Sequence, residues 1–202
     1  MSSGSKVGLT AVGLVVGPIL LGCFLPQSAR EALRLEPVLA LTQPWRLFTA
    51  HAVHLTTSHA ILNLTTFLGF AIALPALRKP ASLVLLLVVA ALSVDAGVLL
   101  RHRDLGWYVG FSGVLYGVAA GGAVLAAQAR KPTGALILAG LVVKLAFDEL
   151  HGTPSSTEAL VGGKVLSESH LYGVLGGVAA TLVWITIYRL ARRSPRDPSG
   201  QP

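Results

Sequence analysis

Residues 105–129 read LGWYVGFSGVLYGVAAGGAVLAAQA, a run without Asp, Glu, Lys or Arg. Of the 202 residues in the chain, 53% are hydrophobic and only 12% are charged, half the share of about 25% that is typical of soluble domains. So few charges cannot cover a globular surface in water. The composition therefore excludes an ordinary soluble enzyme, a disordered chain and a disulfide-rich secreted module, and it predicts a small polytopic membrane protein. Similar charge-free runs occupy residues 7–29, 47–77, 80–94, 132–143 and 169–188.

Four of the charge-free runs reach the length of a membrane-spanning helix, which needs about 20 mostly apolar residues. The runs 80–94 and 132–143 are shorter, because Asp95 and Lys144 interrupt the third and fifth apolar stretches. We predict an all-α fold, a bundle of six transmembrane helices over residues 7–190. A cytoplasmic segment (1–6) precedes the bundle, and a polar, Pro-rich tail (191–202) typical of disorder follows it. The first run could also be a signal peptide, but no small-residue cleavage site follows it, so we expect a retained helix. The helices are expected at residues 7–25, within 46–74, and at 81–100, 112–129, 133–147 and 169–188.

Basic residues indicate the orientation of the bundle. Nine Lys and Arg residues fall in the N-terminal segment, the second and fourth connections and the tail, against six in the other three connections. Because cytoplasmic loops carry the excess of Lys and Arg, both termini are predicted to be cytoplasmic. The net charge of +7 comes from small groups beside apolar runs rather than from a basic stripe with aromatic residues, which argues against nucleic-acid binding. The single cysteine, Cys23, excludes an internal disulfide and a cysteine metal cage.

Polar side chains are rare in the apolar runs, and intramembrane polar residues often carry the function. His59 and Asn63 are four residues apart near the start of the second helix, so they share a helix face. His51 and His54 precede them, either in a loop or on the same helix. On a regular helix, His54 and His59 would point about 140° apart, which disfavours a shared metal. We therefore predict no metal and no cofactor.

Two further polar positions lie where loops meet helices. Ser112 stands between Gly110 and Gly113 at the start of the fourth helix, where unpaired backbone N–H groups can stabilise an oxyanion. His170 opens the sixth helix. Each feature has a simple structural explanation, because Ser caps helices and His anchors helix ends. The orientation, however, predicts all three polar sites at the same non-cytoplasmic end. Together they supply a nucleophile, a base and neutral donors, the set that acyl transfer requires.

In these residues the sequence resembles the rhomboid intramembrane serine proteases over about residues 40–190. A Gly-x-x-x-Gly face, whose main role we expect to be close helix packing, follows the late histidine, and a Trp-Arg pair precedes the second helix. Any one motif is weak, but three in this order on the second, fourth and sixth helices are specific together. The matching positions are His54, His59 and Asn63 (H-x-x-x-x-H-x-x-x-N), Gly110, Ser112 and Gly113 (G-x-S-G), His170, Gly173 and Gly177, and Trp45-Arg46.

The resemblance implies a role for each polar residue. Ser112 would be the nucleophile and His170 its general base, with no acidic third member evident. The Ser112 backbone N–H, His59 and Asn63 would form an oxyanion hole. Supporting positions would be His54, Gly110, Gly113 and Tyr116, the last of which would pack against His170.

Within the family, the stretches YVGFSGVLYG (108–117) and KLAFDE (144–149) look most like the rhombosortase branch. These bacterial proteins are thought to process membrane-anchored partners with a C-terminal Gly-Gly motif, a helix and a basic tail. The resemblance implies location in the bacterial inner membrane, with the active site toward the periplasmic side. A Gly-Gly segment would ease unwinding of the substrate helix, because each Gly disfavours helix by about 1 kcal/mol relative to Ala.

Three other interpretations remain open. The chain could be a general rhomboid protease of other single-pass substrates, or a non-catalytic rhomboid-like protein that binds membrane clients. It could also be a metal or haem protein that uses the histidines, which the spacing disfavours. Lys144 and Asp148 are four apart and could pair on one helix. We assign no role to His51, and we expect Asp95 to help hold the bundle together.

Overall fold

The computed structural model describes the backbone of residues 3–193 and the side chains of residues 10–190. In this part of the chain the structure is all-helical, with one isolated β-bridge and no strand. Three short helices, α2 (Gln27–Leu33), α3 (Arg46–Thr49) and α8 (Ser155–Val161), and two 3-10 helices, η1 (Pro37–Leu39) and η2 (Pro75–Arg78), connect the long ones. The long helices are α1 (Ser3–Phe24), α4 (Thr57–Ala73), α5 (Pro80–Arg101), α6 (Ser112–Gln128), α7 (Pro132–His151) and α9 (Glu168–Arg193).

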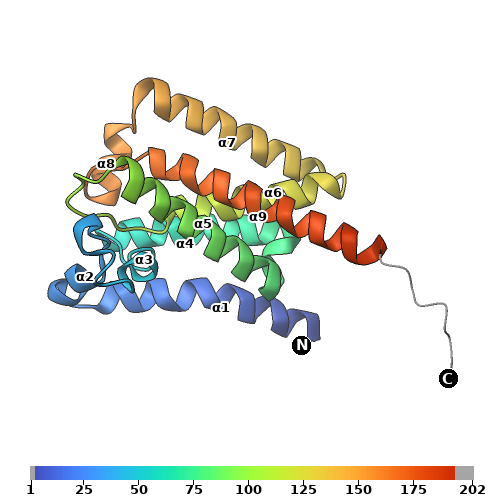
Figure 1. The fold of residues 1–202 in the computed structure, drawn as a ribbon, viewed down its shortest axis with the longest axis horizontal. Helices are drawn as coiled ribbons and strands as arrows, with labels where there is room; N and C mark the ends of the chain where they lie inside the picture. The colour runs from blue at the N-terminus through green and yellow to red at the C-terminus, as the bar shows by residue number, and fades with distance from the viewer. Residues whose placement is uncertain (1–2, 194–202) are drawn as a thin grey trace.

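The long helices form one bundle around α6, which packs against α9, α7, α5 and α4. In Figure 1, α1 and α7 lie at opposite edges of the bundle, and the start of α1 lies at the same end as the end of α9. The short helices α2, α3 and α8 gather at the other end. The candidate nucleophile and base open α6 and α9 at this end, so the arrangement gathers the predicted site there.

Small residues let α6 and α9 approach closely. A Cβ atom on Gly173 would overlap the carbonyl oxygen of Gly113, and a Cβ on Gly177 would overlap that of Gly117. Gly121 continues the same face toward Thr181. Because the two backbones are in contact, the first turns of α6 and α9 are held side by side.

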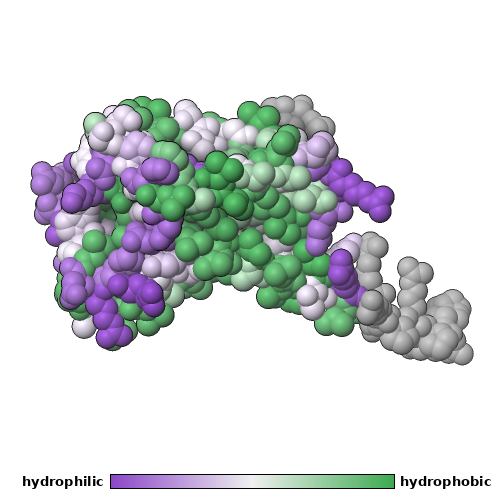
Figure 2. Space-filling model, turned by 90° about the horizontal axis from the view of Figure 1, so that it is seen from above, coloured by the Kyte–Doolittle hydropathy of each residue, from purple (hydrophilic) through white to green (hydrophobic). Residues whose placement is uncertain are grey.

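On the face shown in Figure 2, a band of apolar residues covers the middle of the bundle, and hydrophilic residues gather toward both ends. Apolar patches of this extent mark protein or membrane contact. Within the described residues, Pro80–Arg101 and Glu168–Leu190 are long and apolar enough to cross a membrane, whereas Thr10–Phe24, Thr57–Ala73 and Ser112–Gln128 are apolar but shorter. The predicted count of six spans therefore stays a prediction. Exposed large apolar side chains include Leu21, Phe24, Ile72, Leu92, Leu136, Val143 and Ile187.

The region predicted to hold the second helix, 46–74, is divided. After α3 the chain is irregular until Thr56, whose hydroxyl oxygen accepts a hydrogen bond from the backbone N–H of His59 (3.1 Å) and caps α4. His51 and His54 consequently lie in the loop, so the angular argument, which assumed His54 and His59 on one regular helix, does not apply. At the chain ends, α1 begins at Ser3 and α9 ends at Arg193, and residues 1–2 and 194–202 of the predicted terminal segments lie outside the described residues.

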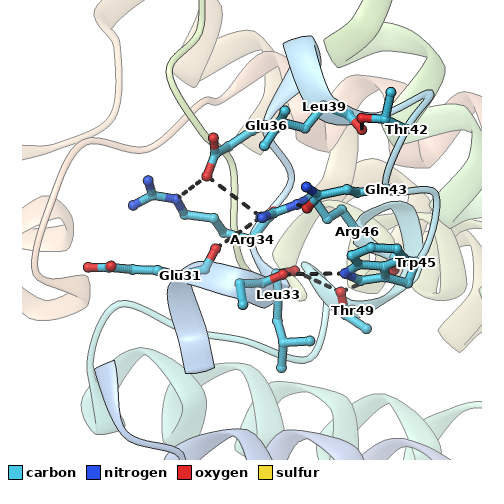
Figure 3. A network of polar contacts seen from close by, with 11 residues as sticks. Glu31, Leu33, Arg34, Glu36, Leu39, Thr42, Gln43, Trp45, Arg46 and Thr49 are labelled. Carbon is cyan, nitrogen blue, oxygen red and sulfur yellow. Dashed lines mark hydrogen bonds and ion pairs between the residues drawn. The ribbon is translucent and has the colours of Figure 1, made fainter. Parts of the chain in front are cut away.

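The connection between α1 and α4 is organised by a buried arginine (Figure 3). Arg46 is only 6% exposed. Its Nη1 donates to the carbonyl oxygens of Glu31 (2.9 Å) and Arg34 (2.7 Å), and its Nε donates to Oε1 of Gln43 (2.6 Å). Glu36 lies 3.6 Å from the same Nη1 and completes the set. One guanidinium thereby ties α2 to α3 and fixes the loop over the end of the bundle.

Replacing Arg46 with alanine should lower the free energy of unfolding by about 2–3 kcal/mol, because the carbonyl oxygens of Glu31 and Arg34 lose their charged donor. Arg46→Lys should restore little, since one ammonium cannot reproduce the planar fork. Thermal unfolding in detergent measures the effect. Arg101→Ala, which removes an exposed arginine at the end of α5, is the control, and an equal loss in both variants would contradict this role.

Candidate active site

A sharp turn places Ser112 at the head of α6. Gly110 has a φ of +116°, which L-residues with side chains rarely adopt, and its N–H donates to the carbonyl oxygen of Ala50 at 2.9 Å. Phe111 is the N-cap, and Ser112 is the first helical residue. The Ser112 N–H therefore has no acceptor within the helix. The N-cap position is held by Phe111 and not by Ser112, so the simple explanation of Ser112 as a helix cap does not hold.

His170 stands beside the serine. Its Nε2 lies 3.2 Å from the Ser112 Oγ, and the residue is only 6% exposed. The ring of Tyr116 stacks on the imidazole with centroids 4.2 Å apart and an angle of 7° between the planes. The distance is within the reach expected between a nucleophile and its general base. The stacking restricts rotation of the His170 ring.

His54 connects α4 to the turn before α6. Its Nε2 accepts a hydrogen bond from the backbone N–H of Phe111 (3.3 Å) and lies 3.0 Å from the Asn63 Nδ2. The backbone donor requires Nε2 to be unprotonated, so the Asn63 amide donates one of its two N–H groups to the same atom. The second N–H of Asn63 remains for another acceptor. His54 thus orients Asn63 and holds the residue before Ser112.

The His59 ring lies against Gly110, in the turn before α6. It meets the ring of His54 edge-on, with centroids 4.8 Å apart. The φ of Gly110 favours glycine, and a Cβ atom there would also crowd the His59 ring, at 3.0 Å from Cε1 and 3.3 Å from Nε2. Within the described residues, no group of three His, Cys, Asp or Glu side chains is arranged to hold a metal ion.

Burial lowers the pKa of His54, in the loop outside the long helices, from 6.5 to about 3, and the neighbouring His59 adds to the decrease. Because the pKa is lower in the folded state, the unfolded state takes up the proton first as the pH falls. Stability that is complete above about pH 6.5 should be lost progressively toward pH 3, by up to about 1.4 kcal/mol per pH unit.

Unfolding midpoints of the wild type and His54→Gln between pH 7 and 4 test this expectation. Glutamine cannot titrate, so the variant should lose stability less steeply with falling pH. Parallel curves for the two proteins would contradict it.

A cavity of about 790 Å³ opens over these side chains. Ser112, His170, His59 and Asn63 all line it. Part of its wall comes from the connection between α7 and α9, which docks onto α4 through a hydrogen bond from the Thr56 Oγ1 to the Val161 carbonyl oxygen (3.1 Å). The cavity is large enough to hold several residues of an extended peptide segment.

Comparison with known proteins agrees with this geometry. A family model described as the rhomboid domain matches residues 41–187, which is more than two thirds of the chain. The chain belongs to the rhomboid family. Rhomboids are membrane proteins, generally intramembrane serine proteases, and act on membrane-protein substrates in the bilayer. No curated protein matches the sequence significantly. The matched region contains all the candidate residues named above and leaves α1 outside.

An acidic residue that the sequence reasoning did not connect to the site reaches His170 in this rhomboid domain. The Oδ2 of Asp148 on α7 lies 3.8 Å from the His170 Nδ1. Its carboxylate also binds the Nζ of Lys144, one helical turn earlier. The four-residue spacing predicted this ion pair, but nothing in the spacing places α7 beside α9. The available signal was the presence of Lys144, Asp148 and Glu149 in the second half of a largely apolar helix.

Two of the remaining histidines of the rhomboid domain, His51 and His102, have separate partners. His51 is buried, with its Nε2 3.2 Å from the Asp95 Oδ1 on α5 and its ring 6.0 Å edge-on from Tyr108. His102 contacts the Tyr172 hydroxyl at 3.0 Å. Both pairs join α5 or its end to neighbouring segments, and neither histidine lines the cavity.

Proposed function

We propose that this rhomboid is an active intramembrane serine endopeptidase that works through Ser112 and His170. The observation that carries the proposal is the 3.2 Å approach of the His170 Nε2 to the Ser112 Oγ inside a cavity. A protein that only binds membrane clients needs no such pair. The resemblance of the motifs to those of rhomboid proteases supports the same conclusion.

In the proposed reaction, the Ser112 Oγ attacks the scissile carbonyl carbon while its proton moves to the His170 Nε2. The oxyanion accepts hydrogen bonds from the Ser112 N–H and from the side chains of His59 and Asn63. His170 then protonates the leaving amine as the carbon–nitrogen bond breaks, which leaves an acyl ester on Ser112. Water hydrolyses the ester, with His170 again serving as base. His54 and Tyr116 support the site by orienting Asn63 and the His170 ring.

The proposal includes six membrane spans, both termini in the cytoplasm and the cavity at the periplasmic side of a bacterial inner membrane. The six long helices and the apolar band support this arrangement. Nine against six basic residues favour the orientation. The shorter apolar helices fit if the membrane adapts locally to them, which costs only fractions of a kcal/mol per Å of mismatch.

For the substrate, we propose membrane-anchored proteins with a C-terminal Gly-Gly segment, a helix and a basic tail, as in rhombosortases. The carbonyl carbons of a regular helix are shielded, so the substrate must unwind before Ser112 can attack. Two glycines ease this step by about 2 kcal/mol relative to two alanines. Processing of other single-pass substrates is the second candidate, supported by the family match itself.

Cleavage of a membrane-anchored reporter in liposomes tests the proposal. We expect the wild type to cut a Gly-Gly reporter faster than a matched Ala-Ala reporter, and Ser112→Ala to cut neither. Ser28→Ala, which alters an exposed serine on α2, is the control and should match the wild type. Equal rates on both reporters would favour the general rhomboid, and cleavage by Ser112→Ala at the wild-type rate would refute the proposal.

A further inference from the structure

The His170 imidazole has an unsatisfied buried atom. Its Nε2 faces Ser112, but its Nδ1 is buried and has no hydrogen-bond acceptor. A buried donor without an acceptor destabilises the fold. In the neutral tautomer that can accept the serine proton, Nδ1 carries the hydrogen. A group able to accept from Nδ1 would therefore favour the reactive tautomer.

Asp148 is the acidic side chain that reaches this atom. Its carboxylate is 2% exposed and lies 3.8 Å from Nδ1, beyond hydrogen-bonding distance but close enough for a strong charge interaction. Both of its oxygens are engaged by the Lys144 Nζ. Lys144 also lines the cavity, and its side chain is 43% exposed. The buried carboxylate thus lies between two cationic partners, the ammonium and the imidazolium that forms during reaction.

We propose that Asp148 is a positioning residue for His170, and that Lys144 regulates how strongly it acts by competing for the same carboxylate. The inference rests on the proposed function of Ser112 and His170. When the imidazole takes the serine proton, the carboxylate stabilises the new positive charge and holds the ring with Nε2 toward Ser112. Lys144 keeps the buried carboxylate paired between turnovers and limits how strongly it attracts the imidazolium.

The proposal predicts opposite effects for the two partners. Asp148→Asn removes the negative charge, so we expect kcat to fall by about 10- to 100-fold with KM little changed. This is less than the roughly 10⁴-fold loss seen where a carboxylate bonds the histidine directly. The acidic limb of the pH–rate profile should move to lower pH. Lys144→Met removes the competing charge, so that limb should move to higher pH.

These shifts can be attributed to the pair because the groups around His170 are known. The titratable groups that face it are Tyr116 of α6, His59 of α4, and Asp148 and Lys144 of α7. If the pair only stabilised the bundle, its substitutions would change stability. Asp148→Asn and Lys144→Met would then not move the acidic limb of the pH–rate profile in opposite directions. Glu149→Gln is the matched control, since it removes an exposed carboxylate one residue further along α7, and it should leave kcat and the limb unchanged.

The experiment measures kcat, KM and their pH profiles for folded wild type, Asp148→Asn, Lys144→Met and Glu149→Gln on one reporter in liposomes. If Asp148→Asn does not fold, the Lys144→Met variant still tests the inference. An acidic limb of its pH–rate profile that stays at the wild-type pH overturns the inference. An Asp148→Asn protein that behaves like Glu149→Gln overturns it as well. In both cases an inactive Ser112→Ala leaves the proposed function intact, whereas an active Ser112→Ala removes the basis for both.

Discussion

Replacing His170 with alanine should reduce reporter cleavage by at least about 10⁴-fold, and Ser112→Ala should do the same. The His170 Nε2 is the only side-chain atom recorded within hydrogen-bonding distance of the Ser112 Oγ among the described residues. Without it the hydroxyl has no base at neutral pH, and its nucleophilicity falls to that of an ordinary serine. The measurement is kcat/KM in liposomes.

The double variant gives the sharper result. When two groups act as one unit, removing both costs about as much as removing either. Ser112→Ala/His170→Ala should therefore be no slower than each single variant. His151→Ala is the control, because this histidine is exposed at the end of α7 and stacks on Phe147, and it should retain wild-type activity. Independent, multiplying losses in the double variant would mean that the two residues do not share one chemical step.

The second large effect concerns the contact between α6 and α9. Gly173→Val should destabilise the fold by at least about 3 kcal/mol, because its Cβ would overlap the carbonyl oxygen of Gly113 and must push the helices apart. The same displacement separates Ser112 from His170, so any folded fraction should be inactive. Thermal unfolding and reporter cleavage measure the two consequences.

Gly140→Val on α7 separates packing from helix propensity. A Cβ at Gly140 meets nothing within 4 Å, while the change from glycine to valine within a helix is the same. We expect the Gly140 variant to retain its stability and activity. If both variants lost stability equally, the close approach of α6 and α9 would not be what holds the site together.

Much of this site could be predicted from the sequence because its signals are local. The resemblance of the Gly-x-Ser-Gly turn and of the histidine before the Gly-x-x-x-Gly face to rhomboid motifs points to Ser112 and His170. The structure brings these two side chains within 3.2 Å, while their catalytic roles stay a prediction. Long charge-free runs indicate the helices, and the all-helical fold of the described residues agrees with them. The rhomboid resemblance is confirmed by the family match, while the narrower rhombosortase assignment stays a prediction.

What could not be predicted depends on contacts between distant segments. Asp148 approaches His170 only because α7 lies beside α9, and the spacing of charges within 144–149 carries no information on that arrangement. His54 reaches Asn63 from a loop because Thr56 starts α4 later than the apolar run begins. The apolar pattern over 46–74 cannot distinguish a loop covered by other segments from a helix, since both bury apolar residues.

The central claim is that Ser112 is a nucleophile activated by His170, and covalent labelling tests it most directly. Purified, folded protein is treated with a fluorophosphonate, and the modified residue is located by mass spectrometry. We expect one adduct on Ser112 in the wild type, and its near-complete loss in His170→Ala with the fold intact. A folded wild type that is not labelled at Ser112, or a His170→Ala protein labelled as fast as the wild type, would contradict the account.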